Sequence, residues 1–232
     1  MITIASICAR GGSTGLPGKN TKILCGKPLI VHSIEQAFAC PAIDRVFVST
    51  DDPQIADVAR AAGADVPFLR PAELATSSAA KMPVIRHLVA EVERLGVKLN
   101  RIVDLDPTSP LRLLSDIEAC IALLDANTDV VITGYPAEKN PYFNMVESKA
   151  DGNIGLVKSI PGGVVARQQA PAVYAMNASV YVWHRCSLEK GIWDGRVRLH
   201  VMPRERSIDI DTSLDFRLVE MLINERSVGV YA

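Results

Sequence analysis

The sequence lacks the features of several protein classes. Its five cysteines are odd in number and widely scattered, with no C-x-x-C pair, so nothing indicates a zinc site or a disulfide framework, and we expect reduced thiols. The formal net charge of -1 and the pI near 6.4 provide no basic field for binding long stretches of DNA or RNA. We therefore expect small-molecule ligands and no nucleic-acid partner.

A hydrophobic run of membrane-spanning length is also absent. The apolar start of the chain has no basic n-region and runs directly into Arg10, so it is a poor signal peptide. These absences predict a cytoplasmic protein with no membrane partner. The chain does have 232 residues with 48% hydrophobic content, which is enough for a full core in one large α/β domain or two small ones.

Short apolar, β-rich runs alternate with helical patterns along most of the chain. Strands are expected at 2–9, 45–50, 66–69, 101–106, 129–133 and 177–183. Helices are expected at 29–40, 53–62, 84–95 and 117–124, the last behind a Ser115–Glu118 capping box, and again after "SIDID" near the end. The helix at 84–95 should bury one apolar face, formed by Val84, Ile85, Leu88, Val89, Val92 and Leu95. This β-α-β rhythm predicts an α/β fold: a Rossmann-like, doubly wound, mainly parallel sheet in a single domain spanning 1–232, with ligands bound at the carboxyl ends of its strands.

The rhythm breaks between residues 135 and 176. This stretch is rich in glycine, proline, asparagine and glutamine and contains only short strand-like pieces. It predicts a small protruding region of the domain, suited to a subunit contact or a cap over the substrate.

A glycine-rich loop follows the first predicted strand. Five residues separate Gly12 from Gly18, and Asn20 stands where a magnesium-binding hydroxyl belongs, so the loop is not a Walker A motif. Its glycine spacing does not fit the dinucleotide fingerprint either. Glycines still let backbone N–H groups approach an anion closely, while Arg10 and Lys19 supply charge. The residues themselves leave two interpretations open, a phosphate-binding loop or a flexible turn.

Five ordered motifs resemble one family. "ARGGSTGLPGKN" resembles the "ARGGSKG-P-KN" signature of the cytidylyltransferases that activate nonulosonic acids, the CMP-sialic acid synthetases, and it is followed in the same order by "VFVSTDD", "RPAELA", "DPTSPLR" and "SIDIDT". The stretches "NPYFNMVE" and "VYAMNASVYVW" look most like the branch that acts on legionaminic acid-like sugars. The resemblance implies a fold of the nucleotide-diphospho-sugar transferase type. It also implies a homodimer in which residues 135–176 reach over the partner's active site.

The resemblance further implies the reaction and its residues. The anomeric hydroxyl of an α-keto acid sugar would attack the α-phosphate of CTP, giving a CMP-sugar and pyrophosphate with Mg²⁺ as cofactor. Lys19, Asp209 and Asp211 would be catalytic, and Asp209 and Asp211 would hold the metal. The implied nucleotide-binding residues are Ala9, Arg10, Gly11, Gly12, Lys19, Asn20, Arg70 and Lys81. The implied substrate-binding residues are Asp106, Thr108, Ser109, Arg112, Arg167 and Asn177.

The spacing of the aspartates fits a metal site. Asp209 and Asp211 are two residues apart, so in an extended segment both carboxylates point to one side and suit a magnesium that takes its other ligands from water and phosphates. The alternative is that Asp211 or Thr212 caps the final helix. Asp104 and Asp106 also share one side of their strand, which permits a metal role there as well.

Three positions depart from the family pattern. Asp106 replaces a glutamine and, as an acceptor, should prefer acetamido N–H groups, sugar hydroxyls or a second metal. Lys81 stands where relatives carry a serine and could donate to the base carbonyl or to a phosphate. Ala175 replaces an arginine, so a substrate carboxylate must rely on Arg167 or another group.

Two other functions remain open on the sequence. The chain could activate a different sugar, such as 3-deoxy-manno-octulosonate, or use another nucleotide. It could also be a non-catalytic nucleotide-binding module that regulates or scaffolds a glycan pathway.

Overall fold

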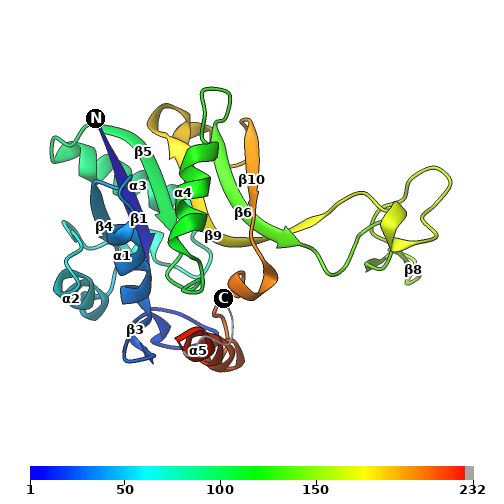
Figure 1. Ribbon diagram of the computed structural model, residues 1–232, viewed down its shortest axis with the longest axis horizontal. Helices are drawn as coiled ribbons and strands as arrows, with labels where there is room; N and C mark the ends of the chain where they lie inside the picture. Colours follow the sequence, from blue (N-terminus) through cyan, green and yellow to red (C-terminus); the bar gives the residue numbers. More distant parts are fainter. Residues whose placement is uncertain (228–232) are drawn as a thin grey trace.

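The computed structural model describes residues 1–227 and is built around one six-stranded sheet (Figure 1). Its strands are β1 (Ile2–Cys8), β4 (Arg45–Ser49), β5 (Leu99–Leu105), β6 (Val130–Pro136), β9 (Tyr174–His184) and β10 (Val197–Val201). They lie in the order β10-β6-β9-β5-β1-β4. β1 pairs in parallel with β4 and β5, β10 pairs in parallel with β6, and β9 runs antiparallel to both of its neighbours. The predicted mainly parallel sheet is confirmed, with β9 as the reversed strand.

Helices cover both faces of this sheet. Within residues 1–227 the α-helices are α1 (Leu29–Ala39), α2 (Pro53–Ala61), α3 (Lys81–Arg94), α4 (Leu114–Leu123) and α5 (Ser213–Ser227). Short 3-10 helices lie at Lys19–Thr21, Ala72–Leu74, Arg167–Gln169, Arg185–Lys190 and Arg204–Arg206. Two small hairpins, β2 (Ile23–Leu24) with β3 (Lys27–Pro28) and β7 (Val146–Ser148) with β8 (Ile154–Leu156), lie outside the main sheet. Among the described residues, none of these helices is both long and apolar enough to cross a membrane.

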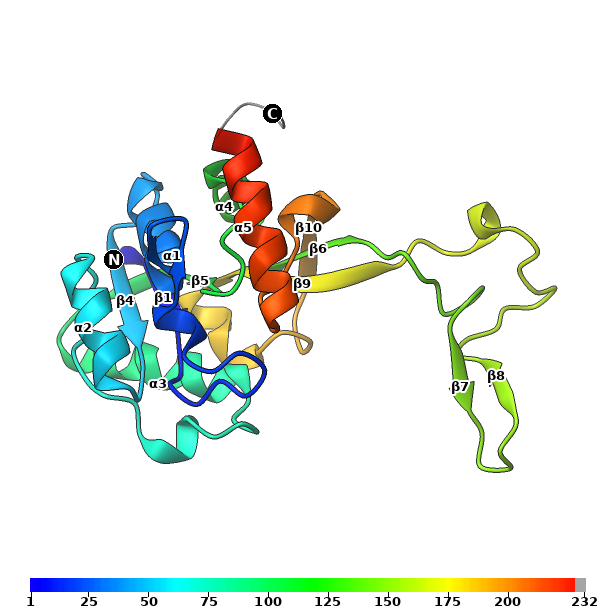
Figure 2. The same ribbon diagram turned by 90° about the horizontal axis from the view of Figure 1, so that it is seen from below.

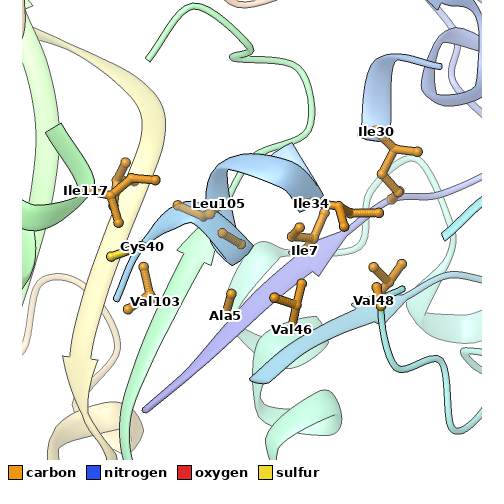
Figure 3. Packing of buried hydrophobic residues seen from close by; sticks show 14 of the residues in the cluster. Ala5, Ile7, Ile30, Ile34, Cys40, Val46, Val48, Val103, Leu105 and Ile117 are labelled. Atoms are coloured by element: carbon orange, nitrogen blue, oxygen red, sulfur yellow. The ribbon is translucent and has the colours of Figure 1, made fainter. Parts of the chain in front are cut away.

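Alternation along β1 divides the core in two. Ala5 and Ile7 face α1, α2 and α4, in the cluster drawn in Figure 3, while Ile4 faces α3 on the other side of the sheet. The doubly wound arrangement follows from this period-two pattern, because consecutive side chains of a strand enter opposite layers. A third, smaller cluster packs α5 against the β2–β3 hairpin and contains Leu24, Leu29, Leu111, Ile210, Phe216 and Val219.

Three local predictions need correction. Leu95 is 60% exposed because α3 ends at Arg94, whereas the other five residues of the predicted apolar face are buried. Residues 66–69 form no strand, and pairing there is limited to one bridge between Phe47 and Asp65; Pro67 has no N–H to donate to a ladder. The helix α4 begins at Leu114, ahead of the predicted capping box, and the Asp116 carboxylate accepts a hydrogen bond from the N–H of Leu113, the residue just before the helix.

The chain between β6 and β9 leaves the body as a long arm. Figures 1 and 2 show residues 137–173 extending away from the sheet, with the β7–β8 hairpin far from the helices. This is where the sequence rhythm breaks. That the arm is a subregion of a single domain stays a prediction, and the last five residues of the predicted domain, 228–232, lie outside the described residues.

Candidate active site

A cleft of about 320 Å³ opens at the carboxyl ends of β1 and β5. These strands are parallel neighbours, so the loops that follow them meet at one edge of the sheet. The cleft is lined by Cys8, Ala9, Arg10, Ser13, Thr14, Gly15, Lys19, Asn20, Arg70, Ala79, Lys81, Val84, Asp104, Leu105, Asp106, Pro107, Thr108, Asp209 and Asp211. Ten of the sixteen predicted site residues are in this set: Ala9, Arg10, Lys19, Asn20, Arg70, Lys81, Asp106, Thr108, Asp209 and Asp211.

Close packing explains two glycines of the loop after β1. A Cβ on Gly15 would lie 2.4 Å from the backbone oxygen of Asp211, so only glycine lets the loop approach this segment. A Cβ on Gly11 would lie 2.6 Å from the carboxylate of Asp52. The Gly11 N–H donates to Asp51 at 3.1 Å, which ties the loop to the end of β4. Gly11 and Gly12, predicted to bind nucleotide, are outside the set that lines the cleft.

Basic and amide side chains form one wall of the cleft. The Lys19 ammonium donates to the Ile210 carbonyl at 2.7 Å and to Asp211 at 3.0 Å. Asn20 donates to the Arg10 carbonyl at 3.0 Å and has a buried Oδ1 without a hydrogen-bond partner. Arg70 is buried and donates to the Ala9 carbonyl at 2.7 Å, so its guanidinium also fixes the start of the loop after β1.

Lys81 contacts two carboxylates at the end of β5, those of Asp104 in the strand and Asp106 just after it. Its ammonium donates to Asp104 at 3.0 Å and to Asp106 at 3.1 Å and lies 4.7 Å from the centroid of the Tyr181 ring. Burial opposes the charge of Lys81, but the two carboxylates outweigh burial and raise its pKa well above the usual value. For Asp106, Lys81 and Thr108 together outweigh burial and lower the pKa. The shared side of Asp104 and Asp106 is confirmed, and an ammonium fills the position that a second metal would need.

The second carboxylate pair has a different environment. Ile208 and Ile210 pack into the third cluster while Asp209 and Asp211 line the cleft, which is the alternation expected of an extended segment. Asp209 has a buried Oδ1 without a partner, and burial, followed by the charges of Asp106 and Asp211, raises the pKa of Asp209 to about 6. The side chain of Asp211 is 71% exposed and contacts Lys19.

This pair fits a magnesium ion. A buried carboxylate oxygen with no partner, next to a second carboxylate, is a donor set that a hard cation satisfies. Within residues 1–227 no group of three or more histidine, cysteine or acidic side chains is arranged to hold a metal, so two protein ligands would leave the remaining positions to water and phosphate oxygens. The helix-capping alternative is also present: Thr212 and Asp215 exchange capping hydrogen bonds, and this leaves the Asp211 carboxylate in the cleft.

Two residues predicted to bind substrate lie inside the protein. Arg112 is 1% exposed and does not line the cleft. Its guanidinium donates to the Asp106 carbonyl at 2.6 Å, to Gln36 at 2.9 Å, and to Ser33 and the Ser179 carbonyl. Burial lowers the pKa of Arg112 to about 10. Arg112 therefore fixes the "DPTSPLR" loop from behind, and Ser109 is likewise fully buried.

Asn177 and Arg167 lie outside the cleft in different places. Asn177 lines a second cavity, of about 360 Å³, which shares Asp209 with the cleft. Arg167 belongs to the arm, where its guanidinium donates to the backbone carbonyls of Ala137 at 3.2 Å and Glu138 at 2.9 Å. The second cavity is lined by Tyr135, Met176, Asn177, Ala178, Arg204, Ser207, Ile208, Asp209, Asp215 and Leu218.

Sequence reasoning missed several residues that line the cleft. Ser13 and Thr14 belong to the loop that drew attention, and their hydroxyls are a signal that could have been used. Cys8 lies at the end of β1, where its residue type predicts a buried strand residue. Ala79 and Val84 give no chemical signal, because only the packing of α3 brings them to the cleft.

Comparisons with known proteins agree with this geometry. Residues 4–184 match the family model described as cytidylyltransferase. The post-translational flagellin modification protein B of Campylobacter coli is 37% identical over 229 residues, covering 97% of this chain and 96% of that protein. The CMP-N,N'-diacetyllegionaminic acid synthase of Campylobacter jejuni is 38% identical over 230 residues, covering 97% of each.

Solved structures share the fold. CMP:2-keto-3-deoxy-manno-octonic acid synthetase complexed with CTP has a TM-score of 0.70 at 17% identity, covering 97% of this chain and 100% of that one. A 4-diphosphocytidyl-2C-methyl-D-erythritol synthase from Anaerococcus prevotii has a TM-score of 0.67 at 13% identity. At such identities the likeness concerns the fold alone. The family model and the near full-length relatives go further: the chain belongs to the cytidylyltransferase family and is a nucleotidyltransferase.

Proposed function

We propose that the protein joins CTP and a nonulosonic, sialic-type acid to give the CMP-sugar and pyrophosphate in a magnesium-dependent reaction. The observation that carries the proposal is the Asp209–Asp211 pair, with its unpartnered buried oxygen, facing Lys19 and the loop after β1 across one cleft. The names of the Campylobacter jejuni relative and of a 32% identical Legionella pneumophila relative, both CMP-N,N'-diacetyllegionaminic acid synthases, support the substrate class.

The cleft residues divide the work of nucleotidyl transfer. Magnesium held by Asp209 and Asp211 would neutralise charge on the phosphate oxygens. Lys19 is positioned to exchange its contact with Asp211 for a phosphate oxygen of the triphosphate, because Asp211 is exposed and the ion pair between them is weakly held. Arg10 and the Gly15 region line the same side and would hold the nucleotide.

Placement of the two substrates follows from the two cavities. CTP would occupy the cleft beside the loop after β1, and the acid sugar would occupy the second cavity, whose wall includes Asn177. Asn177 is held by a hydrogen bond from Thr133 at 2.6 Å and by one to Ser207 at 3.0 Å, so its amide is fixed in orientation. Asp209 lines both cavities, and this supports a reaction in which the sugar hydroxyl would meet the phosphate at the boundary between the cavities, next to Asp209.

The test is a matrix of four nucleoside triphosphates against a panel of acid sugars with pyrophosphate release as the readout. We expect release only when CTP, magnesium and a nonulosonic acid are all present. Preference for another nucleotide contradicts the cytidine assignment, and preference for 3-deoxy-manno-octulosonate favours the alternative sugar. CTP binding in a calorimeter without turnover on any sugar favours the non-catalytic module.

We also propose that the arm pairs with a second copy of the chain in a cytoplasmic homodimer. The arm has apolar side chains that the rest of the chain does not cover. They are Met145, Val146, Ile154, Leu156 and Val165. Ile154 and Val146 are each 61% exposed.

Sedimentation tests the dimer. The Val146→Asp, Ile154→Asp double variant should sediment as a monomer while the wild type sediments as a dimer, because burying two new carboxylates in an apolar contact is unfavourable. Leu95→Asp is the matched control, since Leu95 is 60% exposed at the end of α3 on the body. A double variant that stays dimeric contradicts the arm as the contact.

A further inference from the structure

The second cavity contains one guanidinium that no motif assigned. Of the described residues that line this cavity, Arg204 alone has a cationic side chain. It lies in the 3-10 helix Arg204–Arg206, just before the segment that carries Asp209. The wall also contains the Asp209 and Asp215 carboxylates, so Arg204 is the group on this wall that can pair with the negative group of a ligand.

The Arg204 side chain is free to bind a ligand at the surface, whereas those of the arginines Arg206 and Arg112 are engaged in buried contacts. The side chain of Arg204 is 69% exposed. Arg206, two residues later, donates to both oxygens of buried Asp116, at 3.1 and 2.8 Å, and Arg112 is fully buried. These two arginines hold the fold together and cannot turn toward a ligand without leaving buried groups unpaired.

The present partner of Arg204 is itself a carboxylate. Arg204 forms an ion pair with Glu138, at the base of the arm, and the Glu138 side chain is 50% exposed. The backbone carbonyl of Glu138 also accepts from Arg167 at 2.9 Å, so Glu138 lies between the two guanidinium groups. An ion pair between exposed groups contributes little to stability, and another carboxylate can displace it at little cost.

Ala175 contributes no charge next to this cavity. Ala175 is the register partner of Tyr135 on β6, and Tyr135 lines the cavity. An alanine cannot bind a carboxylate, so the charge must come from elsewhere on the wall.

We propose that Arg204 binds the carboxylate of the acid sugar in this cavity and that Glu138 occupies Arg204 until the sugar arrives. This inference rests on the proposed function and names its specificity-determining residue. A guanidinium can grip a carboxylate through two parallel hydrogen bonds, which a neutral sugar cannot offer. Arg204 would therefore select acids over neutral sugars of the same shape.

Kinetics with a charged sugar and its neutral analogue test the inference. The assay compares the nonulosonic acid with its carboxamide, at saturating CTP, in the wild type, Arg204→Ala and Glu138→Gln. Arg204→Ala should raise KM for the acid about tenfold or more and leave KM for the carboxamide within about twofold, because loss of one charged hydrogen-bonding partner typically costs a factor of ten or more. Glu138→Gln, which removes the competitor, should lower KM for the acid.

A matched control separates binding from folding. Arg198→Ala removes another exposed arginine, 46% exposed and paired with Asp125 on the body, and should leave both KM values unchanged. Calorimetric CTP affinity should be equal in all variants. Equal loss for acid and carboxamide in Arg204→Ala, or no change in either, overturns the inference while the proposed function stands. A wild type that releases no pyrophosphate with any acid sugar overturns both.

Discussion

The cleft contains two pairs of aspartates with the same spacing in sequence, and the two pairs differ in whether a lysine contacts both carboxylates. Asp104 and Asp106 share one ammonium, from Lys81, which donates to both carboxylates at close range. Asp209 and Asp211 also have a lysine nearby, but Lys19 contacts only Asp211 and leaves a buried oxygen of Asp209 without a partner. The chain neutralises the first pair by itself, and the second pair is the one that we propose binds a magnesium ion.

This difference distinguishes charged groups that are compensated within the chain from charged groups that are left to bind a ligand. In a buried carboxylate pair with an internal cation, the charges compensate one another, so removing the cation is costly and little affinity is left for a metal. A pair with an unsatisfied oxygen and a raised pKa stores unfavourable charge that a bound cation relieves. The two lysines differ in their acceptors, since Lys81 donates to two carboxylates, whereas Lys19 donates to one exposed carboxylate and one backbone carbonyl.

The largest effect should come from breaking the second pair. Asp209→Asn and Asp211→Asn should each lower kcat about 100- to 1,000-fold, because an amide is a poor ligand for magnesium and the phosphate charge stays uncompensated. Pyrophosphate release at ordinary magnesium is the measurement. Asp57→Asn, at a surface position that is 78% exposed on α2, is the control and should keep wild-type turnover. Undiminished turnover in Asp211→Asn would rule out the metal assignment.

Removing the cation of the first pair should destabilise the protein. Lys81→Met leaves two adjacent carboxylates uncompensated and should lower the free energy of unfolding by about 3 kcal/mol at pH 7, measured in urea. Because the folded-state pKa of Asp106 lies below its usual 3.8, its contribution is present above that value and is lost as the pH falls through the folded-state pKa. The loss should therefore shrink below about pH 4.

A control variant and the pH series judge this prediction together. Lys190→Met breaks a lysine–aspartate pair whose lysine is 50% exposed, and it should cost less than about 1 kcal/mol. A Lys81→Met deficit that is the same at pH 3 and pH 7 would contradict the role of Lys81 as the cation of the pair.

Replacing Asp209, whose buried oxygen has no partner, should increase the stability of the metal-free protein at neutral pH. The folded-state pKa of Asp209, about 6, lies above its usual 3.8, so metal-free protein is most stable with Asp209 protonated and loses stability as the pH rises from about 4 to about 6. Asp209→Asn removes this loss. In chelator at pH 7.5 the variant should be more stable than the wild type by about 2 kcal/mol, and the two should converge near pH 4. A variant less stable at pH 7.5 refutes the assignment of unfavourable charge to Asp209.

The smallest effect on stability should come from replacing Lys19. Lys19→Met should lower the free energy of unfolding by less than about 1 kcal/mol, because its partner Asp211 is largely exposed. The same urea series as for Lys81→Met gives the comparison. If Lys81→Met and Lys19→Met lower the free energy of unfolding by similar amounts, the proposed difference between a lysine that neutralises two carboxylates and one whose carboxylate partner is exposed is contradicted.

Local sequence patterns predicted most of the cleft. The spacing of Asp209 and Asp211 gives the direction of their side chains, and the family resemblance of the loop after β1 and of the "SIDID" segment is what named Lys19, Asp209 and Asp211 in advance. Arg112 could not be judged this way, because its residue type predicts a ligand contact while its burial among Ser33, Gln36 and Ser179 makes it a structural donor. The strand β10 gave no pattern strong enough to be noticed, and it forms by pairing with β6.

The sequence by itself determined the α/β rhythm, the glycine-rich loop, the break that becomes the arm, and the presence of two carboxylate pairs. These features depend on periodicity and residue type, which are local properties. Only the tertiary structure decided which pair is neutralised, which arginine is buried and which one faces a cavity. Charge compensation depends on burial and on distances of a few ångströms between side chains far apart in the chain, such as Lys81 and Asp104 or Arg204 and Glu138.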